Sequence, residues 1–178
     1  GVPTGYFDLD NILSGLQKSD LIICAGRPSM GKTALALSIA RNAALEYGHR
    51  VGVFSLEMSN TQLVERLITA EARVDSHLVR TGRLPKNEWK RLSQAAGPLS
   101  EANIFIDDSA GLHVMELRAK ARQLKAEHDV DLIIVDYIQL LNAGGKIESR
   151  QQEISFISRS LKALAKDLNI PILALSQL

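Results

Sequence analysis

The residues from 26 to 34 have the types and spacing needed to bind the phosphates of a nucleoside triphosphate. Gly26, four further residues, Gly31, Lys32 and Thr33 fit the pattern G-x-x-x-x-G-K-[ST]. The glycines let backbone N–H groups face the phosphates, Lys32 would reach the β- and γ-phosphates, and the Thr33 hydroxyl would bind Mg²⁺. The other positions expected to line the nucleotide are Arg27, Pro28, Ser29, Met30 and Ala34. The alternative, a glycine-rich turn with a solvated lysine, is disfavoured by the strand pattern before the loop and the helix pattern after it.

Three polar side chains follow apolar runs elsewhere in the chain. Glu57 comes after VGVFSL, Asp136 after LIIV, and Gln177 after ILALS. The carboxyl ends of parallel strands share one edge of a sheet, so these side chains should lie beside the phosphate-binding loop. Asp136 would hold Mg²⁺ through its water shell, and Glu57 would orient and deprotonate an attacking water. Glu57 has a second interpretation, an exposed acid at a helix start, and from the residues alone the role of Gln177 as a contact to the γ-phosphate stays open.

The segment 142–150, NAGGKIESR, combines a glycine pair with basic charge near the same edge of the sheet. Lys146 and Arg150 are therefore candidates for contacts to DNA. Arg150 falls at the start of a predicted helix, where a cation opposes the helix dipole, and a residue placed against its local preference is often placed for function. The alternative is a solvated surface loop.

These side chains need a sheet to bring them together. Apolar runs predict strands over 21–25, 51–54, 103–107, 132–136 and 171–175. Residues with helical spacing lie between the runs, as in the helix predicted over 33–47. Because strands alternate with helices, the expected fold is α/β with a mostly parallel sheet flanked by helices, right-handed crossovers and the active site at the carboxyl ends of the strands.

Several helix ends are predicted from local patterns. The S-x-x-Q sequences that start at Ser59 and Ser149 predict capping boxes. Thr4 is expected to cap a short first helix. Pro85 suits the first position of another helix, which the Gly-Pro pair at 97–98 should bend or end.

Composition narrows the class of protein. The 178 residues, 46% hydrophobic and 23% charged, suit one globular domain, and a net charge of +1 means that any nucleic-acid contact must be a local patch. Cys24 is the single cysteine, which excludes an internal disulfide and fits a reducing cytosol. The four histidines lack ligand spacing, so no zinc site is expected. No apolar run approaches the ~18 residues of a membrane span, and no secretory signal opens the chain.

Both ends of the chain suggest a fragment. It starts with Gly1 instead of Met, and it stops directly after an apolar strand. We therefore expect residues 1–178 to be a single ATPase domain that is truncated at its C-terminal end.

Five segments together resemble one family across essentially the whole chain. They are GRPSMGKTALAL, FSLEMS, LIIVDYIQLL, SRQQEISFISRSLKALAKDLNIP and ALSQL. They closely resemble the RecA-like motor domain of the DnaB family of bacterial replicative DNA helicases, and SLEMS, DYIQL and SQL in this order are specific to it. The resemblance implies a ring-shaped cytoplasmic homohexamer that hydrolyses ATP with Mg²⁺, translocates on single-stranded DNA and unwinds the replication fork. It also implies a primase and a helicase loader as partners.

The same resemblance suggests a role for each site residue. It assigns Lys32 and Thr33 to phosphate and Mg²⁺, Asp136 to Mg²⁺, Glu57 to the catalytic base and Gln177 to sensing the γ-phosphate. The family's collar domain, linker helix, further DNA-binding loop and arginine finger have no counterpart in this sequence. Two other functions stay open: a RecA-like recombinase with similar site residues, and a nucleotide-gated interaction module without significant turnover.

Overall fold

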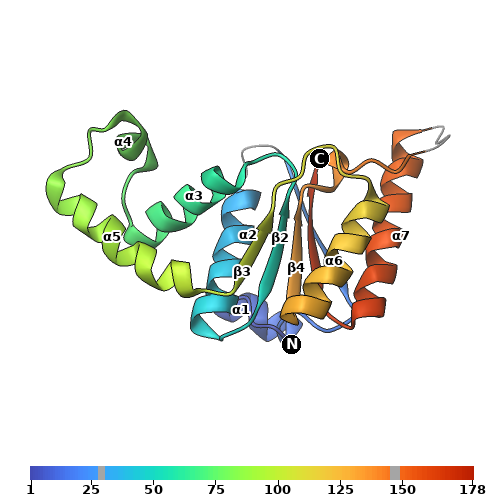
Figure 1. Ribbon diagram of the computed structural model, residues 1–178. Coiled ribbons are helices and arrows are strands. Elements are labelled where there is room, and N and C mark those ends of the chain that lie inside the picture. Colours follow the sequence, from blue (N-terminus) through green and yellow to red (C-terminus); the bar gives the residue numbers. More distant parts are fainter. Residues whose placement is uncertain (28–30, 145–148) are drawn as a thin grey trace.

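The computed structural model describes residues 1–27, 31–144 and 149–178 (Figure 1). Within these residues, five strands form one sheet in the spatial order β1-β5-β4-β2-β3, and every neighbouring pair is parallel. The strands are β1 Leu21–Gly26, β2 Val51–Ser55, β3 Ile104–Asp107, β4 Leu132–Asp136 and β5 Ile172–Gln177. The predicted α/β class and parallel sheet are therefore confirmed.

Helices cover both faces of the sheet (Figure 1). Those described are α1 Phe7–Leu13, α2 Lys32–Arg41, α3 Asn60–Ala72, α4 Ser76–Thr81, α5 Lys86–Glu101, α6 Val114–His128 and α7 Arg150–Leu168. A π-helical turn, η1 Asn42–Glu46, extends α2, and a 3₁₀ turn, η2 Ile138–Leu140, follows β4. Figure 1 shows α2 on one face, α6 and α7 on the other, and α4 and α5 reaching away from the sheet.

The alternation of side chains along β4 divides the core into two parts. Ile133 and Val135 pack in the core beneath α6 and α7, whereas Leu132 and Ile134 pack in the core beneath α2. All four side chains are buried. A central parallel strand covered on both faces needs such a continuous apolar run, and it gives the edge beyond Asp136 a rigid support.

Two predicted helix starts are observed, one of them in part. At Ser59 the complete capping box forms with Gln62. At Ser149 the side-chain oxygen accepts a hydrogen bond from the Gln152 N–H at 3.1 Å. These bonds satisfy donors that the first turn of a helix leaves without partners.

Two other local predictions were wrong. The N-cap of α1 is Tyr6 and not Thr4; the Thr4 hydroxyl accepts from the Tyr6 N–H at 3.2 Å and donates to the Asp10 carboxylate at 2.7 Å. Pro85 is the N-cap of α5 and not its first helical residue. That helix also continues past Pro98 to Glu101, although the proline has no N–H to donate to the preceding turn.

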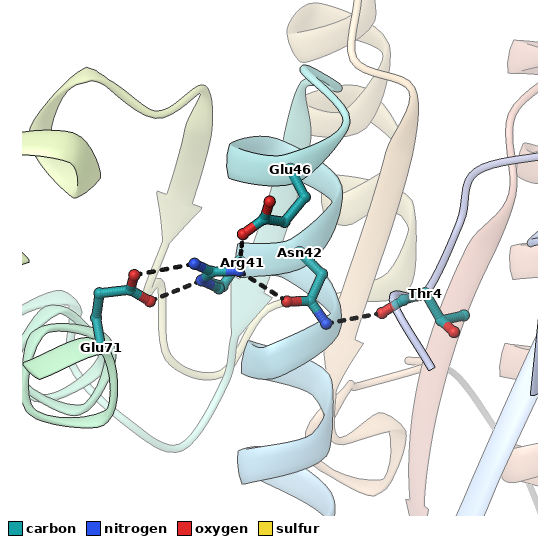
Figure 2. Close-up of polar contacts among 5 residues, drawn as sticks. All are labelled: Thr4, Arg41, Asn42, Glu46 and Glu71. Atoms are coloured by element: carbon teal, nitrogen blue, oxygen red, sulfur yellow. Dashed lines mark hydrogen bonds and ion pairs between the residues drawn. The ribbon is translucent and has the colours of Figure 1, made fainter. Parts of the chain in front are cut away.

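An ion-pair network joins the end of α2 to α3 (Figure 2). Arg41 donates to both carboxylate oxygens of Glu71, at 2.6 and 2.9 Å, and to Glu46 at 2.6 Å. Asn42 accepts from Arg41 at 3.1 Å and donates to the Thr4 carbonyl at 3.0 Å. The hydrogen bond between Arg41 and Glu71 raises the pKa of the guanidinium and lowers the pKa of the carboxyl. These five residues are called the Arg41 network below.

None of the helices in the described part of the chain combines the length and the apolar composition needed to cross a membrane.

Candidate nucleotide site

The phosphate-binding loop leads from the edge strand β1 into α2. Gly26 is the last residue of β1, and Gly31 is the N-cap of α2. Gly31 has φ +78°, a left-handed conformation that favours glycine, while a Cβ there would meet nothing within 4 Å. Pro28, Ser29 and Met30, which were predicted to line the nucleotide, lie outside the described residues. The first N–H groups of a helix have no intrahelical acceptor, so those at the start of α2 would be available to an anion.

Four other predicted residues lie on either side of this turn. Arg27 directly follows β1 and is exposed, and Ala34 is exposed in the first turn of α2. Lys32 and Thr33 are half-buried, and both reach neighbouring strands. The Lys32 Nζ donates to the carbonyl oxygen of Ser176 in β5 at 2.9 Å, and it lies 6.0 Å from the centre of the Tyr137 ring.

A hydrogen bond between Thr33 and Asp136 joins the start of α2 to the end of β4. The Thr33 hydroxyl donates to the Asp136 carboxylate at 2.9 Å. Burial raises the pKa of Asp136, the Thr33 hydrogen bond opposes that rise, and the negative charge of Glu57 adds to it. A nearby cation would stabilise the charged carboxylate. Hydroxyl and carboxylate oxygens are ligands that Mg²⁺ prefers, so this pair fits a magnesium ion that keeps several waters and phosphate oxygens.

Glu57 lies in a tight turn between β2 and α3. The Ser55 hydroxyl donates to the Met58 carbonyl at 2.7 Å and closes the turn, while the Leu56 N–H donates to the Asp136 carbonyl at 2.9 Å. Glu57 is exposed at the same edge of the sheet as Asp136. The structure therefore brings together the strand-end acids that the sequence predicted to be neighbours.

Gln177 is the last residue of β5 and pairs in register with Gly26 of β1. Its main-chain groups bind a residue that sequence reasoning did not single out, Gln139 in η2. The Gln139 Nε2 donates to the Ser176 hydroxyl at 2.8 Å and to the Gln177 carbonyl at 2.9 Å. The Gln139 Oε1 accepts from the Gln177 N–H at 3.1 Å. These three bonds are called the Gln139 clamp below; the only signal for it in the sequence was the glutamine within DYIQL.

The two candidate DNA contacts differ in what the structure describes. Lys146 lies outside the described residues. Arg150 is the first residue of α7, and its exposed guanidinium donates to the main-chain carbonyl of Gln139 and to the carboxylate of Glu153. Arg150 is thus connected to the site edge through Gln139.

Comparison with known families covers the whole chain. Residues 1–178 match the family model described as DnaB-like helicase C terminal domain. The chain belongs to this DnaB-like family. It is 51% identical to the replicative DNA helicase DnaB of Geobacillus stearothermophilus, over 100% of this chain and 39% of that protein. It is 55% identical to the replicative DNA helicase DnaB of Rhodothermus marinus, over 100% of this chain and 19% of that protein. The chain thus spans about two fifths or less of these relatives.

Solved structures share the fold as well. One of them, described as an ATPase domain, has a TM-score of 0.93 and 36% identity, and the match covers 99% of this chain and 63% of that one. A DnaB-like replicative helicase, described with its interactions with primase, has a TM-score of 0.94 and 37% identity over 100% of this chain and 44% of that one. The RecA-like fold and the resemblance predicted from the sequence are therefore confirmed.

Proposed function

We propose that the chain is the motor domain of an ATP-dependent replicative DNA helicase. It would bind and hydrolyse ATP with Mg²⁺ in order to translocate on single-stranded DNA and unwind the duplex at the replication fork. The observation that carries this proposal is the convergence of Lys32, Thr33 and Asp136 at one sheet edge, in a chain that belongs to a helicase family. Membership in that family implies the use of a nucleotide.

The proposed chemistry is in-line attack of a water on the γ-phosphate. Lys32 would exchange its bond to the Ser176 carbonyl for bonds to the β- and γ-phosphates, because a phosphate is the stronger, charge-assisted acceptor. Thr33 and Asp136 would hold Mg²⁺, which supplies charge neutralisation at the phosphates. The exposed Glu57 carboxylate would orient the water and accept its proton.

The remaining predicted residues complete the proposed nucleotide site. Gln177 would hydrogen-bond the γ-phosphate from the end of β5. The other residues proposed to surround the phosphates are Gly26, Arg27, Pro28, Ser29, Met30, Gly31 and Ala34. The left-handed turn at Gly31 and the exposure of Arg27 and Ala34 support this arrangement.

Partners and cellular location follow from the same proposal. Lys146 and Arg150 would contact single-stranded DNA, and the protein would work as a homohexameric ring in the cytoplasm. Primase and a helicase loader are the proposed protein partners; the similar structure described with primase supports the first of them. We propose that residues 1–178 act as one RecA-like domain within a longer protein, as the greater length of the relatives suggests.

Steady-state ATP hydrolysis by the full-length protein, with and without single-stranded DNA, tests the proposal. Turnover should rise when DNA is added and should fall at least about 10²-fold in Glu57→Gln. Only the protein that hydrolyses ATP should unwind a forked duplex. Glu101→Gln, at the end of α5 before β3 begins, is a matched control that removes an exposed carboxylate at the opposite end of the strands.

The outcome also separates the two other functions. Intact biological activity of the full-length protein in Glu57→Gln, together with nucleotide binding but no turnover in the wild type, would favour a nucleotide-gated interaction module and make Glu57 an ordinary helix-terminal acid. An open filament on DNA, seen by electron microscopy of the full-length protein, would favour a recombinase.

A further inference from the structure

The last residues of β5 extend beyond the strand that should pair with them. The register of β4 with β5 ends at the pair Val135 and Ala174, whereas β5 continues to Gln177. The N–H and C=O groups of one strand residue point to the same side, so those of Gln177 on the β4 side need partners from elsewhere. The Gln139 side chain supplies both of them, an acceptor for the N–H at 3.1 Å and a donor for the C=O at 2.9 Å. One amide thus replaces a missing strand neighbour.

Ser176 is held from two sides at the same point of β5. Its hydroxyl accepts from Gln139 at 2.8 Å, and its carbonyl accepts from Lys32 at 2.9 Å. If Lys32 turns to a bound phosphate, as proposed above, the Ser176 carbonyl loses this partner. The Gln139 clamp would then hold Ser176 and Gln177 in place. It would thereby also fix the direction of the Gln177 side chain.

Gln139 has a further contact through its main chain. Its main-chain carbonyl accepts a hydrogen bond from the Arg150 guanidinium at the start of α7. The contacts from the phosphate-binding loop to Arg150 therefore run from Lys32 to Ser176, from Ser176 to Gln139, and from Gln139 to Arg150. Every step is a hydrogen bond between described residues. Gln139 takes part through both its side-chain amide and its main-chain carbonyl.

We propose that Gln139 is a positioning residue that couples the nucleotide edge of the site to the DNA-contacting start of α7. Its side chain fixes the end of β5, and its carbonyl holds Arg150, so a shift of Ser176 and Gln177 on nucleotide binding is passed to Arg150. The inference rests on the proposed function, because it concerns how DNA changes the turnover of ATP. A purely structural role would instead lower the stability of the protein without separating nucleotide binding from its response to DNA.

Two substitutions in the full-length protein test the side chain. Gln139→Glu keeps an acceptor for the Gln177 N–H but loses the donor to Ser176 and to the Gln177 carbonyl, and Gln139→Ala removes all three bonds. For both variants we measure ADP affinity, the thermal midpoint, and ATP turnover with and without single-stranded DNA. ADP lacks the γ-phosphate, so its affinity reports a folded phosphate-binding loop that does not depend on Gln177.

The expected result is an ADP affinity within about twofold of wild type and a loss of DNA stimulation by at least about tenfold. Ser176→Ala, which removes one of the three bonds, should give an intermediate loss and remains informative if a Gln139 variant folds poorly. Gln123→Ala, which removes an exposed glutamine of α6 that hydrogen-bonds Glu127, should leave the stimulation unchanged.

Three results would overturn the inference, and they are distinguishable. Wild-type stimulation in both Gln139 variants and in Ser176→Ala would show that the clamp carries no coupling, while the proposed function stands. ADP affinity and stimulation falling in parallel would assign Gln139 a structural role. Absence of DNA stimulation in the wild-type protein itself would overturn the proposed function together with the inference.

Discussion

The two ends of α2 each carry a cation, and their surroundings are opposite. Lys32 begins the helix, where the dipole disfavours a positive charge, and its hydrogen bond goes to an uncharged main-chain carbonyl. Arg41 ends the helix, where the dipole favours a cation, and it is bound by the carboxylates of Glu71 and Glu46 (Figure 2). The charge of Arg41 is neutralised within the fold, while that of Lys32 remains available to a ligand. One helix thus carries a cation that is paired within the fold at its end and a cation that is proposed to bind phosphate at its start.

Replacing Lys32 should have the largest effect on activity and little effect on stability. Lys32→Met removes the cation that would bind the phosphates, so ATP turnover by the full-length protein should fall at least about 10²-fold. It removes one hydrogen bond to a carbonyl, so the free energy of unfolding should change by less than about 1 kcal/mol. Turnover assays and denaturant titration measure the two effects. Lys18→Met, at an exposed lysine before β1, is the control and should change neither.

Replacing Arg41 should show the reverse pattern. Arg41→Met leaves two carboxylates without their partner, which should lower the free energy of unfolding by about 2 kcal/mol. The network borders a cavity of about 750 Å³ between α2 and α3, so water can reach Glu71 and limit the loss. Turnover at a temperature where the variant is folded should stay within about threefold of wild type. A loss of turnover comparable with that of Lys32→Met would break the comparison, and Arg83→Met, an exposed arginine, is the matched control.

The Arg41 network should also depend on pH. The hydrogen bond from Arg41 lowers the pKa of Glu71 from its ordinary value of 4.5, so the folded state binds the proton less readily than the unfolded state. Its stabilisation is therefore complete above pH 4.5 and is lost as the pH falls through the lowered pKa. Glu71→Gln should cost about 1 kcal/mol at pH 7, and this difference from wild type should close under acid. Denaturant titrations between pH 7 and pH 3 test this, and a constant difference would contradict it.

The smallest expected effect concerns Arg150. Glu153 shares the guanidinium of Arg150 with the Gln139 carbonyl and offsets part of its charge. Glu153→Gln should therefore tighten binding of single-stranded DNA by about two- to threefold at low salt, because exposed pairs are worth about 0.5 kcal/mol. Fluorescence anisotropy measures the affinity. The same substitution in an Arg150→Ala background should have no effect, and an equal gain there would show that Glu153 acts through general repulsion of DNA.

The parts of the site that the sequence could predict are those encoded within a few residues. The spacing of Gly26, Gly31, Lys32 and Thr33 and the apolar run before Asp136 each fix a local geometry, and the parallel sheet brings their ends together. The helix starts at Ser59 and Ser149 are equally local. Strand alternation was enough to predict the class of fold, which the described sheet confirms.

The contacts that were missed depend on distant segments. Gln139 binds the end of β5 because β5 extends beyond the last residue that pairs with β4. No residue near position 139 in the sequence indicates this register. The pair between Arg41 and Glu71 joins residues 30 positions apart on different helices. Thr4 was expected to cap a helix, but its hydroxyl binds the carboxylate of Asp10, six residues later, and the N–H of Tyr6. Local patterns predict what a residue can bind, and the fold selects which partner it meets.

The π-helical turn after Arg41 has a consequence for how this helix tolerates change in length. Five residues of an α-helix make about 1.4 turns, which would place positions 41 and 46 on different faces. A π-helical turn closes over five residues, and in η1 it brings Glu46 within 2.6 Å of Arg41. Deleting one residue between them would leave the two side chains four positions apart, the spacing at which a regular α-helix also makes them neighbours. The wide turn thus accommodates one additional residue in the chain while the ion pair at the end of the helix is kept.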